Sequence, residues 1–497
     1  RELCAAAGAS ALALPALAQS TGSLPAPSAS APAGAPPAVR PDPLLALVNR
    51  TTLGFELETW EEARRIGHAA FLERQLQLAS IDDGALAAKL ATLPSLGLSG
   101  PELHAAYPTT LEMKTATWEL KRAVVLRGVH SRRQLFERTV EFWSDHFNID
   151  HFKGADRLLK TVDDRDVIRR HAFGAFGELL RASAHSPAMS HYLDNWANHW
   201  NAPQTNYSRE LLELHTLGVD AGYTETDVHE VARCFSGWSY YNFDDPGQFG
   251  TFKYAAEQHD PLAKQVLGLA IPAGGGKSDG EAVLDLLIAH PATRDRVCRK
   301  LCRWFLAYDP PAAVLAAARG AWDANGGDVR AVLRAILAPE SLHAAEPWKQ
   351  RKLKRPFHFA TSLLRAIHAD VHDAQGLCWE LLHVGQLPFD WMAPNGYPDS
   401  FAAWSSGLRG RWNLASRLLD GQIEGVTIAP HKIAALLGHP QPHEIGAAID
   451  RMLTGGTLAP LEVAAVQSFV DAAPNLDWTV LREAIALAAS SPGYQWY

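Results

Sequence analysis

Cysteine is scarce in this sequence, with five residues in a chain of 497. Cys4 lies in an apolar N-terminal stretch, and Cys298 and Cys302 are four residues apart in a helical pattern, a geometry that does not favour a disulfide. No C-x-x-C pair occurs. These spacings exclude a disulfide scaffold. We therefore expect Cys234, Cys298, Cys302 and Cys378 to be free thiols packed in the core.

Basic charge is not in excess either, and long apolar runs are missing after residue 40. The 46 Lys and Arg residues against 54 Asp and Glu residues leave a formal net charge of −8. A nucleic-acid-binding protein needs a basic surface, so nucleic acid is excluded as a partner. No later run approaches the roughly eighteen apolar residues of a transmembrane helix, so we expect no membrane span in the mature chain. The 47% hydrophobic and 20% charged contents are those of a globular protein.

The first 40 residues have the composition of an export signal followed by a linker. The alanine-rich apolar stretch 4–18 ends in the small-x-small site Ala16-Leu17-Ala18, and its low hydrophobicity resembles a truncated twin-arginine signal. Residues 19–40 are almost wholly Pro, Ala, Ser and Gly, a composition that cannot form a core. We predict a signal peptide at 1–18, cleavage near Ala18 and a periplasmic or secreted protein. The alternative for the first stretch is a buried N-terminal helix.

The remainder, 41–497, has apolar residues at three- and four-residue spacing, as amphipathic helices require. Residues 204–217 form a predicted helix that stops at Gly218, and Thr224 with Asp227 three residues on begins the next one, which makes an αα-hairpin. Other helices are predicted at 111–127, 133–147, 280–289, 292–306, 311–324, 329–337, 356–367 and 461–469.

Strand patterns with a period of two are scarce, and the best candidates are 238–243 and 249–254, as a small hairpin. No internal repeat with a fixed period occurs. The predicted fold is mainly α: a multi-helix globular domain over 41–497 with at most one or two small β-hairpins. A separate C-terminal helical subdomain from about residue 425 is left open.

Cofactor motifs fail when their spacing is checked. Gly276-Lys277-Ser278 is not a phosphate-binding loop, because Ile271 stands where that motif needs glycine. The G-x-S-x-G at 276–280 follows a flexible 272–275 segment rather than a strand, so Ser278 does not fit a nucleophile elbow. We predict no cofactor.

Metal motifs fail in the same way. H-E-x-x-H is absent, because Arg233 occupies the place of the second histidine after His229-Glu230. His146 and His151, with Asp145 and Asp150, would bind a metal only if the chain turned sharply there. We interpret them as hydrogen-bonded core groups and predict no metal site.

Polar residues interleaved with aromatic residues are most concentrated between residues 142 and 238. Asn206, Arg209, Glu210 and Glu213 fall at i, i+3, i+4 and i+7, which places them on one face of a helix. In one interpretation Arg209 pairs with Glu213, and the stripe is a buried structural network or a solvated face. In the other, Glu210 and Glu213 line a cleft walled by tryptophans and perform acid/base chemistry.

The candidate site residues follow from these patterns. The predicted catalytic residues are Glu210 as general acid/base, with Asp145 or Glu213 as its partner. Aromatic, amide and charged groups at turns are suited to a polyhydroxylated ligand. The predicted substrate-binding residues are Trp143, His146, Asp194, Asn195, Asn206, Arg209, His259, Asp260, Asn395 and Tyr397.

Several of these blocks together resemble a known family. The segment from Asn206 to Val219 is similar to the signature of the domain-of-unknown-function family numbered 1800, DUF1800. Its other blocks resemble, in order, 142–147, 223–228, 235–238, 259–260, 354–356 and 395–398. The resemblance implies a secreted or envelope-associated bacterial protein, often encoded beside a sulfatase-like partner family. It does not imply a particular reaction.

Two hypotheses about function follow. The first is a hydrolase or lyase that acts on a saccharide-type substrate by carboxylate acid/base chemistry in a polar, aromatic-lined cleft. The second is a non-catalytic envelope or scaffold protein that binds a glycan or a protein partner. The expected partners are a polysaccharide or envelope component and a sulfatase-like protein.

Overall fold

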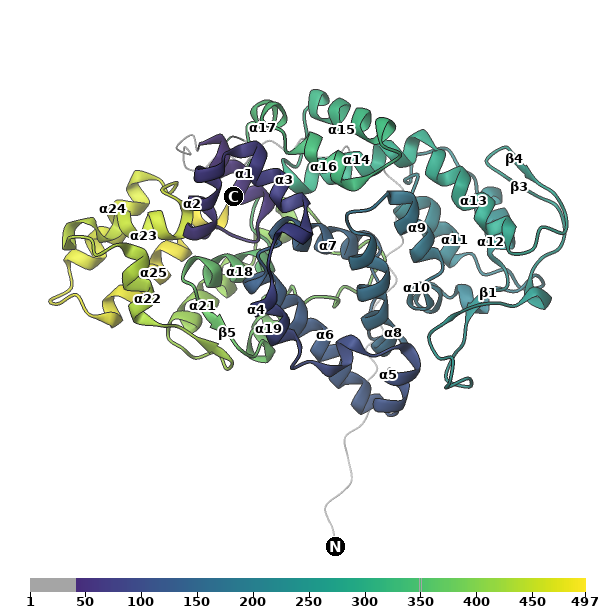
Figure 1. Ribbon diagram of the computed structural model, residues 1–497, viewed down its shortest axis with the longest axis horizontal. Helices are drawn as coiled ribbons and strands as arrows, with labels where there is room; N and C mark the ends of the chain where they lie inside the picture. The colour runs from purple at the N-terminus through teal and green to yellow at the C-terminus, as the bar shows by residue number, and fades with distance from the viewer. Residues whose placement is uncertain (1–41, 348, 350) are drawn as a thin grey trace, which may run out of the picture. The chain divides into compact units, whose positions relative to one another are not determined.

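The computed structural model describes residues 42–497 except 348 and 350. The predicted signal peptide and linker lie outside the described residues. Within them the chain forms 25 α-helices and three two-stranded sheets (Figure 1). The prediction of a mainly α fold is confirmed.

The helices enclose two hydrophobic cores. The first core is built from side chains between Leu47 and Ala345, and the second chiefly from side chains between Phe357 and Tyr494. Helix α6 (Thr110–His130) contributes Met113 and Ala116 to the first core and residues from Ala123 onward to the second. This long helix therefore joins the two cores.

The helices that supply the first core come from the N-terminal two thirds of the chain. They are α1 (Pro43–Thr51), α2 (Leu57–Ile66), α3 (His68–Leu76), α5 (Gly100–Ala106), α7 (Gln134–His146), α8 (Asp156–Asp163), α9 (Phe176–Ala184), α10 (Pro187–Tyr192), α11 (Asn206–Glu210), α12 (Glu225–Phe235), α13 (Ser278–Ala289), α14 (Pro291–Phe305), α15 (Ala312–Ala324), α16 (Val329–Ile336) and α17 (Pro339–Ala345).

The second core collects the later helices and one early helix. Helix α18 packs against α6, so segments far apart in the sequence lie side by side. Helices beyond residue 425 share this core with α18 and α21. The remaining helices are α4 (Gly84–Leu90), α18 (Pro356–Ala366), α19 (Gln375–His383), α20 (Phe401–Trp404), α21 (Leu408–Leu419), α22 (Pro430–Leu437), α23 (Ile445–Thr454), α24 (Pro460–Asp471) and α25 (Trp478–Ser490).

Local sequence signals set several helix boundaries. The backbone N–H of Asp227 donates to the Thr224 hydroxyl at 3.2 Å, and the Thr224 N–H donates to the Asp227 carboxylate at 2.8 Å. This reciprocal capping box satisfies donors that the first turn of α12 leaves free. The predicted helix start at Thr224 agrees with the structure. The preceding helix ends at His215, two residues before its predicted end at residue 217, and Gly218 has a φ of +100° in the turn that follows.

Two of the three sheets are hairpins. Strands β1 (Trp238–Tyr240) and β2 (Phe252–Tyr254) pair antiparallel with Trp238 opposite Tyr254, at the predicted place. Strands β3 (Lys264–Val266) and β4 (Leu269–Ile271) form the second hairpin. Strands β5 (Asp370–Val371) and β6 (Val426–Thr427) pair across more than fifty residues, which no local pattern predicts.

The four cysteines in the described part of the chain, Cys234, Cys298, Cys302 and Cys378, are free and buried. Burial raises the pKa of each of these thiols to about 12, so they are inert core groups rather than nucleophiles. Over residues 42–497 as described, no helix combines the length and apolarity needed to cross a bilayer.

Candidate ligand-binding site

Helix α14 presents four basic side chains on one face. Arg296, Arg299, Lys300 and Arg303 follow the i, i+3, i+4, i+7 spacing, while Leu301 and its apolar neighbours on the helix are buried. The four basic residues line a pocket of about 390 Å³. Its other walls come from the end of α7 and from residues 391–399.

None of these four cations forms an ion pair with a described carboxylate. Arg296 donates to the Leu214 carbonyl at 3.3 Å, and Arg303 donates to the Asp399 carbonyl at 3.0 Å. The lining also contains the carboxylates of Asp145 and Asp399, but each is paired with a cation from outside the pocket. The pocket is therefore electropositive, which suits an anionic ligand.

Lys300 and His146 form a coupled pair at the base of this pocket. The Lys300 ammonium donates to Nδ1 of His146 at 2.8 Å, and Nε2 of His146 contacts the His215 carbonyl at 3.1 Å. The imidazole is then neutral, with its proton on Nε2. Burial, reinforced by neighbouring Arg296 and opposed by Asp145, lowers the pKa of Lys300 to about 7. Lys300 can thus gain or lose its charge near neutral pH.

Aromatic rings form the apolar part of the pocket lining: Phe142, Trp304, Trp391 and Tyr397. The loop that carries two of them is held by polar contacts. The Trp391 indole N–H donates to Asn395 at 2.8 Å, and the Asn148 amide donates to the carbonyls of Trp391 and Ala393 at 2.8 Å. The wall is thereby tied both to itself and to the chain just after α7.

Gly396 allows this loop to approach α7. Its φ is +70°, and a Cβ atom there would lie 2.1 Å from the Asp145 carbonyl oxygen. Only glycine tolerates both the conformation and the close approach. The predicted residues Asp145, His146, Asn395 and Tyr397 are thus brought together in one pocket.

Asp145, a predicted catalytic partner, is engaged in an ion-pair network. Arg355, which directly precedes α18, bonds Asp145 at 2.8 Å and also pairs with Glu141 one turn earlier on α7. Burial raises the pKa of Asp145 to about 6, and Arg355 acts against that shift. Similarly, Asp399 is held by Lys352 at 2.7 Å. Asp145 and Asp399 therefore form part of the pocket wall, and neither forms an ion pair with a cation of α14.

The predicted polar stripe does not form one continuous face. After Glu210 the helix continues as a π-helical turn, Leu211–His215, which adds a residue per turn and shifts the side chains that follow. Arg209 pairs with Glu225 of α12, with both guanidinium nitrogens at 2.7 Å, and not with Glu213. The expected ion pair between Arg209 and Glu213 is therefore wrong.

Glu210 and Glu213 have no hydrogen bond or ion pair through their side chains within the described residues. Burial raises the pKa of Glu210, and the charge of Glu213 raises it further, against Arg209. Glu213 also acts on Arg296, whose lowered pKa reflects burial opposed by that carboxylate. Glu213 thus lies near Arg296 of the α14 pocket, and neither glutamate is part of the pocket lining.

Comparison of the sequence with known protein families identifies the family of this chain. The family described as "Protein of unknown function (DUF1800)" matches residues 46–496. The chain belongs to the DUF1800 family. No curated protein and no solved structure matches the chain.

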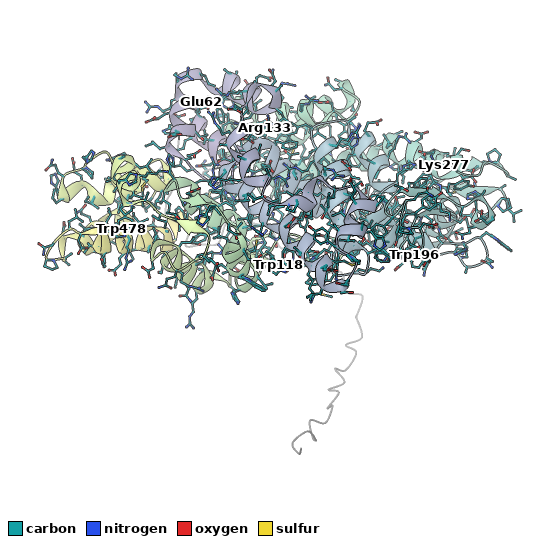
Figure 2. All side chains as sticks on the ribbon, turned by 60° about the horizontal axis from the view of Figure 1, so that its bottom comes forward. Glu62, Trp118, Arg133, Trp196, Lys277 and Trp478 are labelled. Carbon is teal, nitrogen blue, oxygen red and sulfur yellow. The ribbon has the colours of Figure 1, made fainter. Side chains whose placement is uncertain are left out.

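Other predicted site residues of this DUF1800 protein lie apart from the α14 pocket. Trp143 is fully buried, and its indole N–H donates to the Ala172 carbonyl at 3.0 Å. Asp194 pairs with Lys153 at 2.5 Å, and buried Asn195 donates to the Trp238 carbonyl at 3.0 Å. The neighbouring Trp196 is 39% exposed (Figure 2). Asn206 begins α11 and is half-buried.

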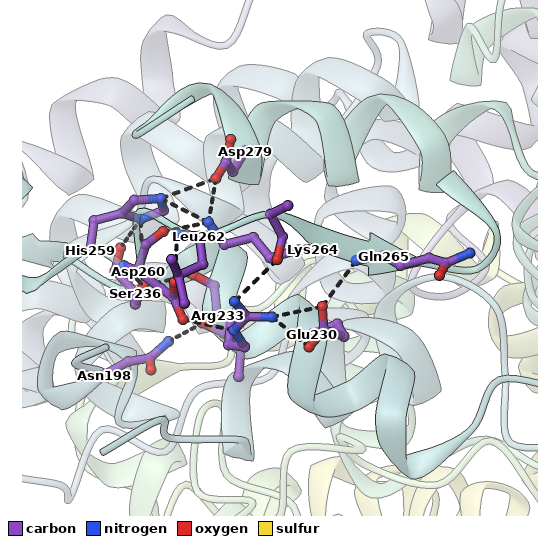
Figure 3. A network of polar contacts seen from close by, with 12 residues as sticks. Asn198, Glu230, Arg233, Ser236, His259, Asp260, Leu262, Lys264, Gln265 and Asp279 are labelled. Carbon is purple, nitrogen blue, oxygen red and sulfur yellow. Dashed lines mark hydrogen bonds and ion pairs between the residues drawn. The ribbon is translucent and has the colours of Figure 1, made fainter. Parts of the chain in front are cut away.

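His259 and Asp260 belong to a buried network beneath α13 (Figure 3). His259 and Lys264 contact the same carboxylate oxygen of Asp279, at 3.1 and 2.6 Å, and Asp260 pairs with Arg233 at 2.7 Å. These partners satisfy one another and connect α12, the β3 strand and α13. The arrangement stabilises the fold locally and offers no open surface.

The residues that sequence reasoning missed are those of α14 itself. The pattern R-x-x-R-K-x-x-R at 296–303 places four cations on one helical face and is visible without a structure. The sequence does not show that this face lines a pocket, because a basic helix face exposed to solvent has the same pattern. Within the described residues, no three His, Cys, Asp or Glu side chains come together in a way that could hold a metal ion.

Proposed function

We propose that this DUF1800 protein is an exported envelope protein that binds an acidic, saccharide-type ligand in the α14 pocket. The observation that carries the proposal is the set of four basic side chains, without carboxylate partners, that face an aromatic-lined space. Guanidinium and ammonium groups pair with carboxylate, sulfate or phosphate substituents. Flat rings such as Trp391 offer a face on which a sugar ring can stack. A volume of about 390 Å³ is within the range of small-molecule sites.

The extracytoplasmic location is part of the proposal and is supported by the signal-like stretch 4–18 and the Pro/Ala/Ser linker that follows. An envelope polysaccharide with acidic groups would be a ligand of the right chemistry at that location. A sulfatase-like partner remains a prediction from the family resemblance.

Binding can be tested with a matched pair of ligands. We expect trigalacturonate to bind and uncharged galactotriose to bind much more weakly, with an affinity that falls as salt is raised. The double variant Arg299→Gln/Arg303→Gln should weaken trigalacturonate binding by at least about tenfold, the equivalent of about 1.4 kcal/mol. Arg334→Gln, which breaks an exposed pair with Glu73, is the matched control and should bind normally. Equal binding of the two sugars, or normal binding by the double variant, would reject the proposal.

A second candidate function, β-elimination on a uronate, is favoured by the Lys300–His146 pair. Arg299 or Arg303 would neutralise the sugar carboxylate and so acidify the neighbouring C5–H bond. Neutral Lys300 would accept that proton while the C4–O bond breaks, a C4–C5 double bond forms and the leaving oxygen takes a proton from water. In this reaction Lys300 acts as the base, whereas hydrolysis would use Glu210 with Glu213, because Asp145 is held by Arg355.

The two outcomes differ in their products. Elimination gives an unsaturated uronate that absorbs ultraviolet light, and Lys300→Met should abolish it while the protein stays folded. Hydrolysis gives only saturated sugars and should depend on Glu210. Binding with no product in either assay would leave the protein as a non-catalytic glycan-binding protein and reject the elimination candidate.

A further inference from the structure

A second basic cluster lies where α1, the segment before α18 and the last residues of the sequence meet. Arg50 from α1, Arg351 and Lys354 from that segment, and His358 from α18 line a cavity of about 50 Å³. The cavity shares no lining residue with the α14 pocket. Its other lining residues carry no carboxylate side chain.

Three of the basic side chains of this cavity are buried and Arg351 is half-buried, and their hydrogen bonds reach only neutral partners. Arg50 is 1% exposed and Lys354 is 5% exposed. Arg50 donates to the Pro347 carbonyl at 3.3 Å, Arg351 donates to the Gly493 carbonyl at 3.0 Å, and Lys354 donates to the Ser362 hydroxyl at 3.0 Å. None of the four forms an ion pair within the described residues.

Two hydrogen-bond donors remain without an acceptor. Nδ1 of His358 accepts from Arg138 at 3.4 Å, so the imidazole proton lies on Nε2. That Nε2 and the Nη1 of Arg50 are both buried and have no hydrogen-bond partner among the described residues. Buried donors are normally paired, so two unpaired donors in residues that line one cavity indicate a missing acceptor.

The surrounding field is strongly positive. Burial lowers the pKa of Arg50 to about 10, with nearby Arg138 adding to the shift. Burial, reinforced by Arg351, also lowers the pKa of Lys354 well below its ordinary value. Burial acts to raise the pKa of Tyr497, yet Arg138 and other cations bring it below its ordinary value. An anion in the cavity would offset the cost of burying these charges.

We infer that this cavity binds a small tetrahedral oxyanion, phosphate or sulfate, as a structural ligand. About 10–15 Å³ of such space holds one water molecule, so about 50 Å³ suits a compact group of a few non-hydrogen atoms. The oxyanion would accept from the Arg50 and His358 donors and offset the charge of Arg351. It would link α1, α18 and the final residues, which the sequence holds far apart. This site is independent of the ligand proposed for α14.

The test uses the whole protein and inorganic phosphate, sulfate and chloride at matched ionic strength. We expect saturable phosphate or sulfate binding by calorimetry and a melting temperature that rises with the logarithm of oxyanion concentration, with no such rise in chloride. Lys354→Met removes one of the cations that line the cavity and should weaken binding at least tenfold. Arg334→Gln, which removes one cation of an exposed pair with Glu73 and lies outside both pockets, is the control and should leave this binding unchanged.

If Lys354→Met does not fold, the less buried Arg351→Gln should give the same loss. Comparing inorganic phosphate with glycerol 3-phosphate separates a free ion from the end group of a larger molecule; either result supports the site. The inference is overturned if the wild type shows no saturable oxyanion binding. It is equally overturned if the two cavity variants bind as well as the Arg334→Gln control does.

Discussion

The Nζ atom of Lys300 lies 2.8 Å from Nδ1 of His146, and the same imidazole reaches the His215 carbonyl through Nε2 at 3.1 Å. This contact connects α14, the end of α7 and the π-helical turn after α11. A change in the charge of Lys300 therefore acts on His146 and on the other groups of the pocket.

Affinity for an acidic ligand should fall as pH rises through about 7, because Lys300 loses its charge there. The bound anion favours the charged form and moves the midpoint upward. Lys300→Met should bind more weakly at low pH and show no such dependence, while Lys300→Arg should stay charged and keep its affinity at higher pH. Calorimetric titration of trigalacturonate across this range measures the effect, and a pH-independent wild-type affinity would contradict it.

The free energy of unfolding of the ligand-free protein should rise as pH increases above about 7, whereas ligand affinity falls. The folded pKa of Lys300 is lowered, so the unfolded chain binds this proton more tightly between about pH 7 and its ordinary value. The Lys300 contribution to the free energy of unfolding therefore rises with pH through that window. Lys300→Met should abolish this pH dependence. The variant should melt above the wild type near pH 7, and the difference in melting temperature should narrow as pH increases.

Glu210→Gln should fold with near-normal stability, because the Glu210 side chain has no ion-pair partner to lose and stands beside Glu213. The matched control is Glu137→Gln, which breaks a buried pair with Arg169 at 2.5 Å and should cost about 3–5 kcal/mol. Thermal unfolding compares the two variants. A melting point several degrees low for Glu210→Gln would reveal a structural role, whereas a normal melting point with lost turnover would place Glu210 in the chemistry.

Gly396→Ala should open the pocket wall and weaken ligand binding, since its Cβ would lie 2.1 Å from the Asp145 carbonyl oxygen. Gly385→Ala is a close control: its φ of +85° imposes the same backbone strain, but nothing lies within 4 Å of the new Cβ. We expect backbone strain alone to lower the stability of the control variant by about 1–2 kcal/mol and its ligand affinity to stay unchanged. Similar affinities for the two variants would show that loop position does not matter.

Arg355→Met should destabilise the protein by about 3–5 kcal/mol, because it strands the buried carboxylates Glu141 and Asp145. The loss should shrink at lower pH, where Asp145, whose pKa burial raises to about 6, can take up a proton in the folded state. Adding Glu141→Gln and Asp145→Asn should restore part of the stability. A destabilisation independent of pH would point to lost packing against Trp304, whose ring lies 4.4 Å from the guanidinium carbon.

By itself the sequence determined the mainly helical class, the family, the capping box at Thr224 and the β1–β2 hairpin. These features depend on hydrogen bonds and apolar spacings within a few residues, so they can be read locally. It also predicted that Asp145, His146, Asn395 and Tyr397 are site residues, although not that α14 would supply the cations that face them.

Only the tertiary structure decided how the charges are paired. Arg209 turns to Glu225 because a π-helical turn interrupts the expected stripe, and Arg355 reaches Asp145 from 210 residues away. Long-range packing selects such partners, and many pairings satisfy the same sequence. The same reason explains the Arg50 cavity, whose walls extend from Ala46 to Tyr497 and exist only once the two ends of the described chain meet.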